Sequence, residues 1–436
     1  MTDSDLQPVP PKQRILSETH LLLLLAAVQF THIMDFMVMM PLGPQLMRDL
    51  SLTPQQFGNL ISVFGITAGL IGLCTAPFMD RFDRRKLLLF CYSGFILGTF
   101  ACGLSHTPGQ LMLARAVCGA FGGVSSAVIM AIVADVVPPE HRARGMGIIM
   151  TAFSAAAALG VPFGLKLAQW WQWETPFLFI AAIAALAWAM LFRVLPPVRG
   201  HLQEGRRVSV RDFLVLLRDG NAWRGITLMV ATVWGHFTVI PYLSPFLVRN
   251  VGMPEKSLFL VYLVGGLASI VTGPRVGKLA DRYGRFRIYV VLVFGACLVI
   301  RILTSSGPMP VWGVLVIAAA FFIFASGRFI PAQAVISLAV PSQRRGAYMS
   351  LIGCSRDLAM GVTTVIAGHI ITTGPRGELQ HFDLLGLLAI GVSIASLWLF
   401  LRVKSAECRG SPPPVLRDHL QFVEVTDALL DAREGI

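Results

Sequence analysis

Charged side chains inside long apolar runs are the residues of this sequence best placed to do chemistry. Asp35 lies in an apolar run at 20–41, and Arg115 lies in another at 109–136. Both are about six residues from the run ends that would face the same side of a membrane, or about 9 Å deep along a helix. A charge near the centre of a bilayer costs roughly 2.5–3.5 kcal/mol and therefore usually faces a partner or a wet cavity. We expect Asp35 and Arg115 to pair or to compete at this depth.

Asp35 is a carboxylate that can carry a proton. If its access to solvent changes between two states of a carrier, it can load a proton in one state and release it in the other, in exchange for a substrate. The alternative is a purely structural ion pair with Arg115. His32 precedes Asp35 by three residues and shares its helical face. His32 either tunes Asp35 or, as we favour, is a polar packing residue.

Three further charged residues lie deep in apolar runs closer to the C-terminus. Arg328 lies in the run at 311–338, and Arg356 and Asp357 lie in the run at 347–372. All three are about ten residues, or about 15 Å, from the same side, so an ion pair between Arg328 and Asp357 is allowed. Arg356 is about 100° around the helix from Asp357 and can face a cavity. Binding of a charged substrate and locking of helices stay open as interpretations.

Methionine and aromatic side chains supply weaker candidates for a substrate cavity. Flexible thioethers suit an apolar pocket with varied occupants, although such residues at helical spacing are more often ordinary packing. These weaker candidates are Met39, Trp234, His236 and Tyr242.

The composition explains why charges in apolar runs are informative here. Of the 436 residues, 55% are hydrophobic and only 14% are charged, against about 25% charged residues in a soluble domain. These values exclude a disordered chain, a coiled coil and an ordinary cytosolic enzyme. A membrane-spanning helix needs about 20 apolar residues, and the sequence predicts an all-α integral membrane protein with twelve such helices. The runs are 20–41, 55–77, 86–104, 109–136, 146–168, 176–195, 223–247, 257–279, 288–304, 311–338, 347–372 and 385–403.

The distribution of basic residues predicts the orientation. If the N-terminus is inside, the inside segments hold 27 of the 36 lysines and arginines and the outside segments hold five. Because cytoplasmic loops are enriched in these residues, this ratio predicts that both termini are cytoplasmic. The net charge of +12 therefore reflects membrane topology, and no nucleic-acid partner is expected.

The twelve runs divide into six and six around a polar segment. We expect a cytoplasmic N-tail at 1–19, a six-helix bundle at 20–195, a cytoplasmic linker at 196–222, a second bundle at 223–403 and a cytoplasmic C-tail at 404–436. Residues 208–217 of the linker form either a short amphipathic helix on the membrane surface or a plain tether, and we favour the tether.

The two halves resemble each other at an offset near 201 residues. The stretch from Asp80 to Arg84 matches the stretch from Asp281 to Arg285, and Pro139 matches Pro341. Pro41, near the end of the first run, matches Pro241 in the seventh. Parallel six-helix repeats are the architecture of a large class of transporters, with the substrate site near the midplane between the halves.

These loop and helix motifs resemble those of the major facilitator superfamily over about residues 20–403. Within it, the chain is similar to the twelve-helix drug:proton antiporter group, which includes arabinose-efflux-like bacterial permeases. The family loop motif G-x-L-x-D-R-x-G-R-[RK] fits the second copy, from Gly277 to Arg285, whereas Ala76 and Asp83 replace both glycines in the first copy. The resemblance implies a conformational latch made by Asp80, Arg81, Arg84, Asp281, Arg282 and Arg285. Acids beside arginines can pair with helix ends and loops, although topology charge alone is the alternative.

Two further motifs carry the resemblance. Residues 111–119 resemble the family pattern L-x-x-x-R-x-x-Q-G, with Cys118 in place of Gln, and the family implies a proton-coupling role for Arg115. Residues Gly160, Pro162 and Gly164 resemble the glycine-rich pattern of the exporting branch. Glycine and proline in a membrane helix allow close packing and a bend. The resemblance ties this helix to proton antiport.

The expected function is export of a small organic molecule or drug driven by protons, by one chain in the bacterial inner membrane. The alternative is a carrier of a specific metabolite, such as a sugar or an amino acid, that is independent of protons or couples to them by symport. An integral-membrane enzyme and a transporter-like sensor are less favoured, because the sequence has no H-E-x-x-H, G-x-S-x-G or Walker A motif and only short tails. No cofactor and no metal site are expected.

Overall fold

The computed structural model describes residues 18–138, 141–199, 210–341 and 344–406. In this part of the chain, twelve helices are long and apolar enough to cross a membrane, and each predicted run coincides with one of them to within about four residues. The spans are α1 (Glu18–Val38), α3 (Pro54–Thr75), α4 (Arg84–Cys102), α5 (Pro108–Val136), the α6–η2–α7 helix (Arg144–Trp170), α8 (Thr175–Val194), the α11–η3–α12 helix (Gly220–Arg249), α13 (Leu258–Tyr283) with η4 (Glu255–Ser257) before it, α14 (Arg285–Thr304), the α15–η5–α16 helix (Val311–Ser337), α17 (Arg345–Ile370) and α18 (Phe382–Arg402).

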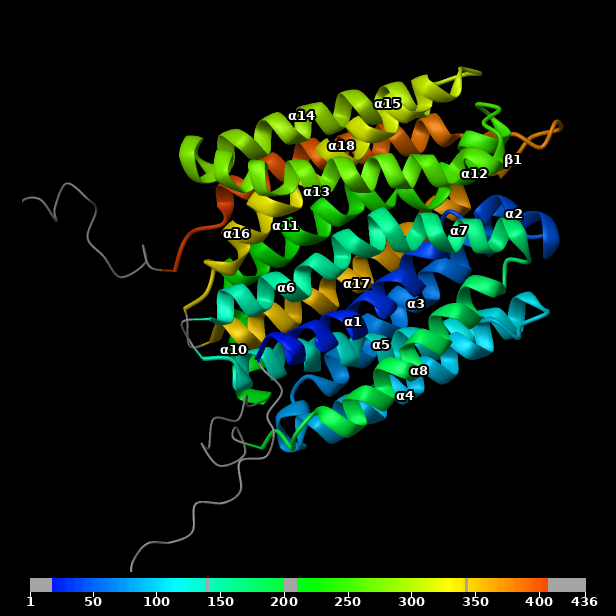
Figure 1. Ribbon diagram of the computed structural model, residues 1–436. Coiled ribbons are helices and arrows are strands. Elements are labelled where there is room, and N and C mark those ends of the chain that lie inside the picture. Colours follow the sequence, from blue (N-terminus) through cyan, green and yellow to red (C-terminus); the bar gives the residue numbers. More distant parts are fainter. Residues whose placement is uncertain (1–17, 139–140, 200–209, 342–343, 407–436) are drawn as a thin grey trace, which may run out of the picture.

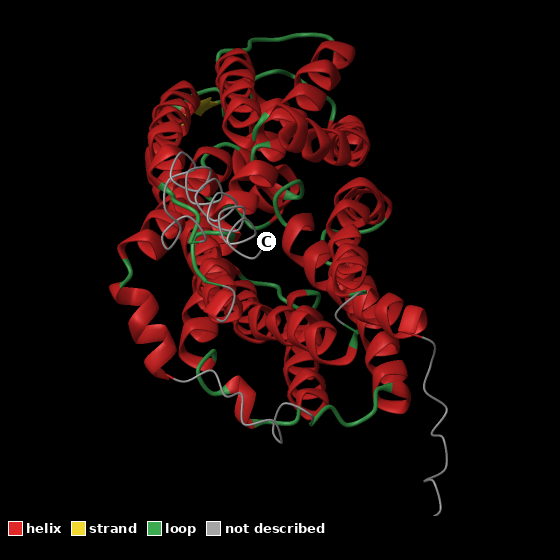
Figure 2. Cartoon of the chain, turned by 90° about the vertical axis from the view of Figure 1, so that its left-hand side faces the viewer, coloured by secondary structure: helices red, strands yellow, loops and turns green. Residues whose placement is uncertain are grey.

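The helices form two six-helix bundles that lie side by side (Figure 1). The N-half runs from α1 to α8, and the C-half runs from α11 to α18. At one end, here called the basic end, α4 and α14 begin at Arg84 and Arg285. This end is on the left of Figure 1 and faces the viewer in Figure 2. At the other end, here called the hairpin end, β1 (Thr372–Thr373) pairs antiparallel with β2 (Leu379–Gln380).

The first helix of each half breaks before a proline. In the N-half, α1 ends at Val38, Pro41 follows, and the short α2 (Gly43–Asp49) continues the path. In the C-half, α11 (Gly220–Phe237) is followed by Pro241 within η3 (Ile240–Tyr242) and by α12 (Leu243–Arg249). Proline has no N–H to donate to the preceding turn, so a helix ends or bends at this position. The matched prolines therefore produce the same break in both halves.

A repeated hydrogen bond joins the first and third helices of each half. The hydroxyl oxygens of Thr31 and Tyr92 lie 2.8 Å apart in the N-half. The hydroxyl oxygens of Thr232 and Tyr289 lie 3.2 Å apart in the C-half. Both pairs are buried. The internal repeat expected from the loops therefore extends to the polar contacts within the bundles.

The linker contains a helix that packs on the C-half. The helix α10 spans Val210–Arg218, and its Phe213 and Leu216 are buried against α11 and α17. The tether interpretation of residues 208–217 is therefore wrong for 210–218, because these two apolar side chains find a hydrophobic surface to cover. Residues 1–17, 200–209 and 407–436, which include most of both predicted tails, lie outside the described residues.

The halves meet along α3 and α17 at backbone distance. A Cβ atom added to Gly65 would lie 2.7 Å from the Asp357 carbonyl oxygen, and one added to Gly361 would lie 2.8 Å from the Ser62 carbonyl oxygen. Small residues at such positions allow membrane helices to approach closely. The second contact joins η2 (Ala156–Gly160) to α13, where a Cβ on Gly266 would lie 2.6 Å from the Ala158 Cα atom.

We expect Gly361→Ala to weaken the contact between the halves. The added methyl group meets α3 backbone at less than van der Waals distance, and such overpacking typically costs about 1–3 kcal/mol. Gly353→Ala on the same helix is the matched control, because nothing lies within 4 Å of its Cβ position. The measurement is SDS-induced unfolding of both purified variants. Equal stability of the two variants would contradict this view of the interface.

Candidate functional site

The N-half contains a fully buried ion pair between α1 and α5. Arg115 donates from Nη1 to the Asp35 Oδ2 atom at 2.6 Å, and the same nitrogen lies 3.4 Å from the Asp35 carbonyl oxygen. Neither side chain is exposed to solvent. Of the two arrangements expected for Asp35 and Arg115, pairing and competition, the structure has the pairing.

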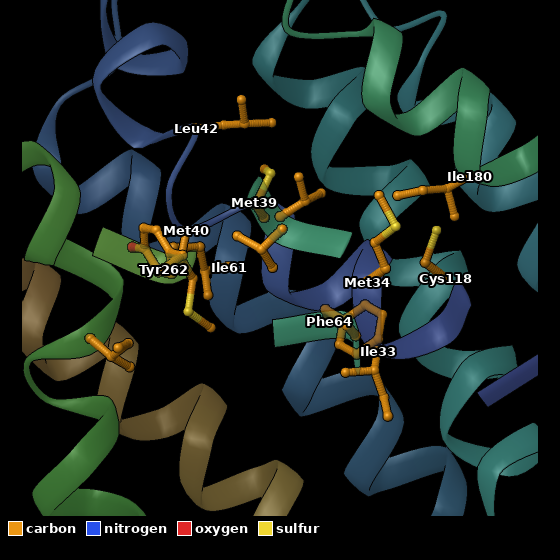
Figure 3. Close-up of a cluster of buried hydrophobic side chains, with 14 of the residues drawn as sticks. Ile33, Met34, Met39, Met40, Leu42, Ile61, Phe64, Cys118, Ile180 and Tyr262 are labelled. Carbon is orange, nitrogen blue, oxygen red and sulfur yellow. The ribbon is translucent and has the colours of Figure 1, made fainter. Parts of the chain in front are cut away.

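Apolar and aromatic groups surround this ion pair. The Arg115 guanidinium lies over the Phe64 ring, 4.6 Å from the ring centroid, which offers it a cation–π contact. Figure 3 shows Met34, Phe64 and Cys118 among the buried side chains of this region. Because neither charge reaches solvent, each depends on the other for its compensation.

Several polar atoms around the pair have no hydrogen-bond partner among the described residues. They are Asp35 Oδ1, Arg115 Nε and Nη2, and both ring nitrogens of His32. The His32 ring packs between Phe64 and Phe95, with centroid distances of 5.7 and 5.4 Å. Buried polar atoms in native proteins almost always bond to protein, water or a ligand. These atoms therefore give the site unused hydrogen-bonding capacity that water, a proton or a substrate can use.

The glycine-rich segment of the fifth span packs against the helix that carries Asp35. A Cβ on Gly160 would lie 3.2 Å from the Met34 Sδ atom, and one on Gly164 would lie 2.7 Å from the Val38 Cγ2 atom. Pro162 lies at the start of α7 (Val161–Trp170), directly after the π-helical turn η2 that ends α6 (Arg142–Ala155). Such a turn accommodates the carbonyl group that the proline leaves without a donor. The fifth span therefore contacts α1 both before and after Asp35.

The sequence analysis missed two residues of this region, Thr99 and Cys102. Cys118 Sγ lies 3.9 Å from Cys102 Sγ and 3.6 Å from Thr99 Oγ1, and all three side chains are buried. Thr99 and Cys102 belong to α4, so only the packing of α4 on α5 brings them to Cys118. The unusual Cys118 in the arginine motif was the one available signal.

The C-half holds a second buried arginine with a different environment. Arg328 donates from Nη1 to Ser393 Oγ at 2.6 Å, from Nη2 to the Thr232 carbonyl at 3.3 Å and from Nε to the Ala325 carbonyl at 3.2 Å. Ala325 belongs to the π-helical turn η5 (Phe322–Ser326) between α15 (Val311–Phe321) and α16 (Phe329–Ser337). The allowed pair between Arg328 and Asp357 does not form, because serine and carbonyl oxygens already occupy the guanidinium.

Asp357 instead pairs with its neighbour. Arg356 Nη2 lies 3.0 Å from Asp357 Oδ1, and the Arg356 side chain is 53% exposed although it lies in the middle of α17. Arg356 shares a helical face with Met360 and Thr363, which are both buried, so this face points inward. Water therefore reaches the region between the halves at the level of Arg356.

The weaker cavity candidates occupy varied positions. The His236 ring stacks on Phe321 at 5.4 Å, and Trp234 is half-buried. Met39 is fully buried in the core. Tyr242 donates to the Pro54 carbonyl of the other half at 3.1 Å, which makes it part of a contact between the halves.

Polar contacts join the two halves at the hairpin end. Arg48 Nη1 lies 2.7 Å from Glu255 Oε1, and Gln169 donates to the Glu255 carbonyl at 2.9 Å. Gln55 and His369 share a hydrogen bond of 2.8 Å. Together with the Tyr242 contact, these interactions close the molecule at this end.

The first loop motif attaches the linker to α4. Asp83 caps α4 by accepting from the Arg85 backbone N–H at 2.9 Å, and it also accepts from the Val198 N–H and from Arg199 Nε. Partial burial opposes ionisation of Asp83, but these hydrogen bonds outweigh it and lower the pKa of the carboxyl group. The aspartate that replaces the family glycine therefore has a structural use.

The remaining motif residues differ between the two copies. Arg84 forms an ion pair with Asp135 at the end of α5, and the side chain of Asp80 lies outside the described part of the structure. Arg81 and Arg282 lie over the rings of Phe78 and Tyr283, and Asp281 and Arg285 form no ion pair or hydrogen bond in the described part. Gly284 has φ = +95°, which explains why the second copy keeps glycine, whereas Asp83 has φ = −59°.

In the residues that the structure describes, no group of three or more His, Cys, Asp or Glu is arranged to hold a metal ion.

Comparisons with known proteins agree with this architecture. The sequence model of the Major Facilitator Superfamily matches residues 25–364. An uncharacterized MFS-type transporter of Bacillus subtilis, YceJ, is 24% identical over 388 residues, which cover 88% of this chain and 96% of the relative. A probable sugar efflux transporter of Mannheimia succiniciproducens is 24% identical over 360 residues, which cover 79% and 84%. A bacterial homolog of the human lysosomal transporter Spinster shares the fold, with a TM-score of 0.69, 15% identity and coverage of 88% and 96%.

We expect Arg115→Gln to be strongly destabilising and Asp35→Asn to suppress part of that effect. Removing one partner leaves an uncompensated buried charge, which typically costs about 3–5 kcal/mol. The double variant leaves no such charge, so its loss of stability should be smaller than the sum of the two single losses. SDS-induced unfolding of the three variants measures this coupling. Additive losses would mean that the two side chains act independently.

We expect Asp83→Ala to release the linker from α4. The variant loses the acceptor of the Val198 and Arg199 hydrogen bonds. Trypsin at pH 7.5 should then cleave after Arg199 several-fold faster than in the unmodified protein. Asp49→Ala, a change at the opposite end, is the control. Unchanged cleavage in Asp83→Ala would show that other contacts hold the linker.

Proposed function

Because this chain belongs to the Major Facilitator Superfamily, we propose that it is a secondary active exporter, in which proton entry drives a small organic molecule out of the cell by alternating access. The observation that carries this proposal is the buried Asp35–Arg115 ion pair. Among the acidic residues in the described part of the chain, Asp35 is the one that is fully buried within a membrane-spanning helix.

Protonation of Asp35 would change the contacts between α1 and α5. A neutral Asp35 no longer offers Arg115 a negative partner, and the guanidinium already has two nitrogens, Nε and Nη2, without acceptors. A substrate or water can then compete for Arg115. The glycine-rich helix α7 packs on both sides of Asp35, so a shift of α1 reaches the interface with α13.

The two ends of the molecule support an alternating-access cycle. The hairpin end is closed by polar contacts between the halves, whereas the half-exposed Arg356 indicates that water enters from the basic end. We propose that the basic end is cytoplasmic, with both termini inside, because it carries most lysines and arginines. The described conformation then faces the cytoplasm. A membrane potential supplies about 2.3 kcal/mol per proton charge for each 100 mV.

The substrate class follows only from relatives. The Mannheimia succiniciproducens relative is a probable sugar efflux transporter, so sugars are the first compounds to test. We propose that the protein works as a monomer in the bacterial inner membrane, with protons, a small-molecule substrate and the lipid bilayer as its partners, and without cofactor, catalytic activity or nucleic acid.

A carrier of one specific metabolite is the second candidate. It is favoured by the pairing of Arg356 with Asp357, which places one positive and one negative group beside water between the halves. Such a pair can bind the charged groups of an amino acid or the hydroxyl groups of a sugar. In that case Asp35 would bind substrate and a proton gradient would be unnecessary.

The proposal is tested with Asp35→Asn in a bacterium without its own efflux pumps. The unmodified protein should raise the inhibitory concentration of at least one toxic compound or sugar analogue several-fold, and Asp35→Asn should lose this effect at equal membrane expression. Asp49→Asn, which is exposed at the hairpin end, is the matched control. Substrate-induced proton release from vesicles then measures coupling.

Equal resistance from the unmodified protein and Asp35→Asn would exclude Asp35 as the coupling acid. If neither protein confers resistance although both reach the membrane, the metabolite carrier becomes the better hypothesis, and uptake assays with sugars and amino acids follow.

A further inference from the structure

A hollow at the hairpin end is lined by residues of both halves. It has a volume of about 550 Å³. Ser51 and Thr53 line it from the loop between α2 and α3, and Arg249, Thr373 and Arg376 line it from the C-half. None of these residues takes part in the proposed transport site.

Positive charge gathers in this hollow. Arg249, the last residue of the α11–η3–α12 span, and Arg376, in the turn between β1 and β2, both line it. In the described part of the chain, neither guanidinium has an ion-pair or hydrogen-bond partner. Two acids lie nearby: Glu255 pairs with Arg48 at 2.7 Å, and Glu378, which accepts from the Arg376 backbone N–H at 2.9 Å, offsets part of the positive charge.

The N-half contributes a further positive potential. The 22-residue helix α3 begins directly after Thr53, whose hydroxyl caps the Gln56 N–H at 3.2 Å. The N-terminus of a helix carries a partial positive charge. The hollow therefore combines a helix N-terminus from one half, two arginines from the other and the hydroxyl groups of Ser51, Thr53 and Thr373.

We propose that this hollow binds a phosphate group and that the bound phosphate holds the two halves together at the hairpin end. Guanidinium groups recognise phosphate through paired N–H donors, and serine and threonine hydroxyls supply further donors. A carboxylate satisfies the same donors less completely, because it has two oxygens instead of three or four. The ligand is either free inorganic phosphate or the headgroup of a phospholipid in the facing leaflet.

The consequence for the conformational cycle follows from linkage. Because the lining belongs to both halves, the site is complete only while the hairpin end is closed. A ligand that binds one of two states shifts the equilibrium toward it by the factor 1 + [L]/Kd. Phosphate at about ten times its Kd should therefore lower the ratio of open to closed molecules about tenfold.

The first test is thermal unfolding of the purified full-length protein in detergent. Inorganic phosphate should raise the Tm above its value in chloride of equal ionic strength. The double variant Arg249→Gln/Arg376→Gln should lose this increase. Arg301→Gln, an exposed arginine at the same end that does not line the hollow, should keep it.

The second test measures the distance across the hairpin end with spin labels at residues 109 and 307. These glycines lie in the two halves, and nothing lies within 4 Å of their Cβ positions, so labels fit there. Exposed Cys74 and the tail Cys408 are replaced by Ser to avoid further labelling. Phosphate should enrich the short distance in this protein but not after the two Arg→Gln changes.

The outcomes separate the two sources of phosphate. If free phosphate acts in detergent, it is the ligand; if the effect appears only in nanodiscs with anionic phospholipid, and the double variant loses it there, the ligand is a headgroup. No phosphate effect in either medium, or an equal effect in the double variant, would overturn the proposal. Neither measurement needs a substrate or a proton gradient. The phosphate proposal can therefore be tested even if the proposed transport function is wrong.

Discussion

The burial of an ion pair in a membrane bundle is the constraint on which the rest of the N-half depends. Two charges without water are tolerated only while each keeps the other as a close partner. This requirement fixes α1 against α5 at the level of Asp35 and Arg115, where the charged nitrogen and oxygen lie 2.6 Å apart. It also makes the arrangement sensitive, because one proton on Asp35 removes the attraction. In the proposed exporter, the same interaction would be a structural bond while Asp35 is ionised and would weaken when Asp35 is protonated.

The contacts between the halves are of two chemical kinds. The seam of α3 and α17 is built from backbone packed on backbone, at Gly65 and Gly361, and is indifferent to charge. At the hairpin end, the Arg48–Glu255 ion pair is exposed and is worth little alone, whereas the Tyr242–Pro54 hydrogen bond is buried. In the proposed transport cycle, the exposed ion pair would cost less to break than the close packing of the α3 and α17 backbones would cost to separate.

The fold could be predicted from the sequence because each helix carries its own signal. Apolar length gave the twelve spans, and matched prolines and loop motifs gave the repeat. The Asp35–Arg115 pair was predictable because both residues lie at the same depth. Depth along the helix did not predict the partner of Arg328. That partner is Ser393, and only the packing of α18 brings this serine to the arginine. The role of Asp83 was equally hidden, because its bonds reach residues more than a hundred positions away.

The two halves share a framework of helices and hydrogen bonds but differ in their buried charges. The Thr–Tyr bond that supports the first helix is present in both halves. At the offset of 201 residues, however, the position of Asp35 corresponds to His236, which stacks on Phe321 and has no carboxylate partner among the described residues. The buried arginine of the C-half is held by neutral oxygens that do not change with pH. In the proposed exporter, protonation of Asp35 would therefore change the contacts of the N-half, while the buried arginine of the C-half would keep its neutral partners.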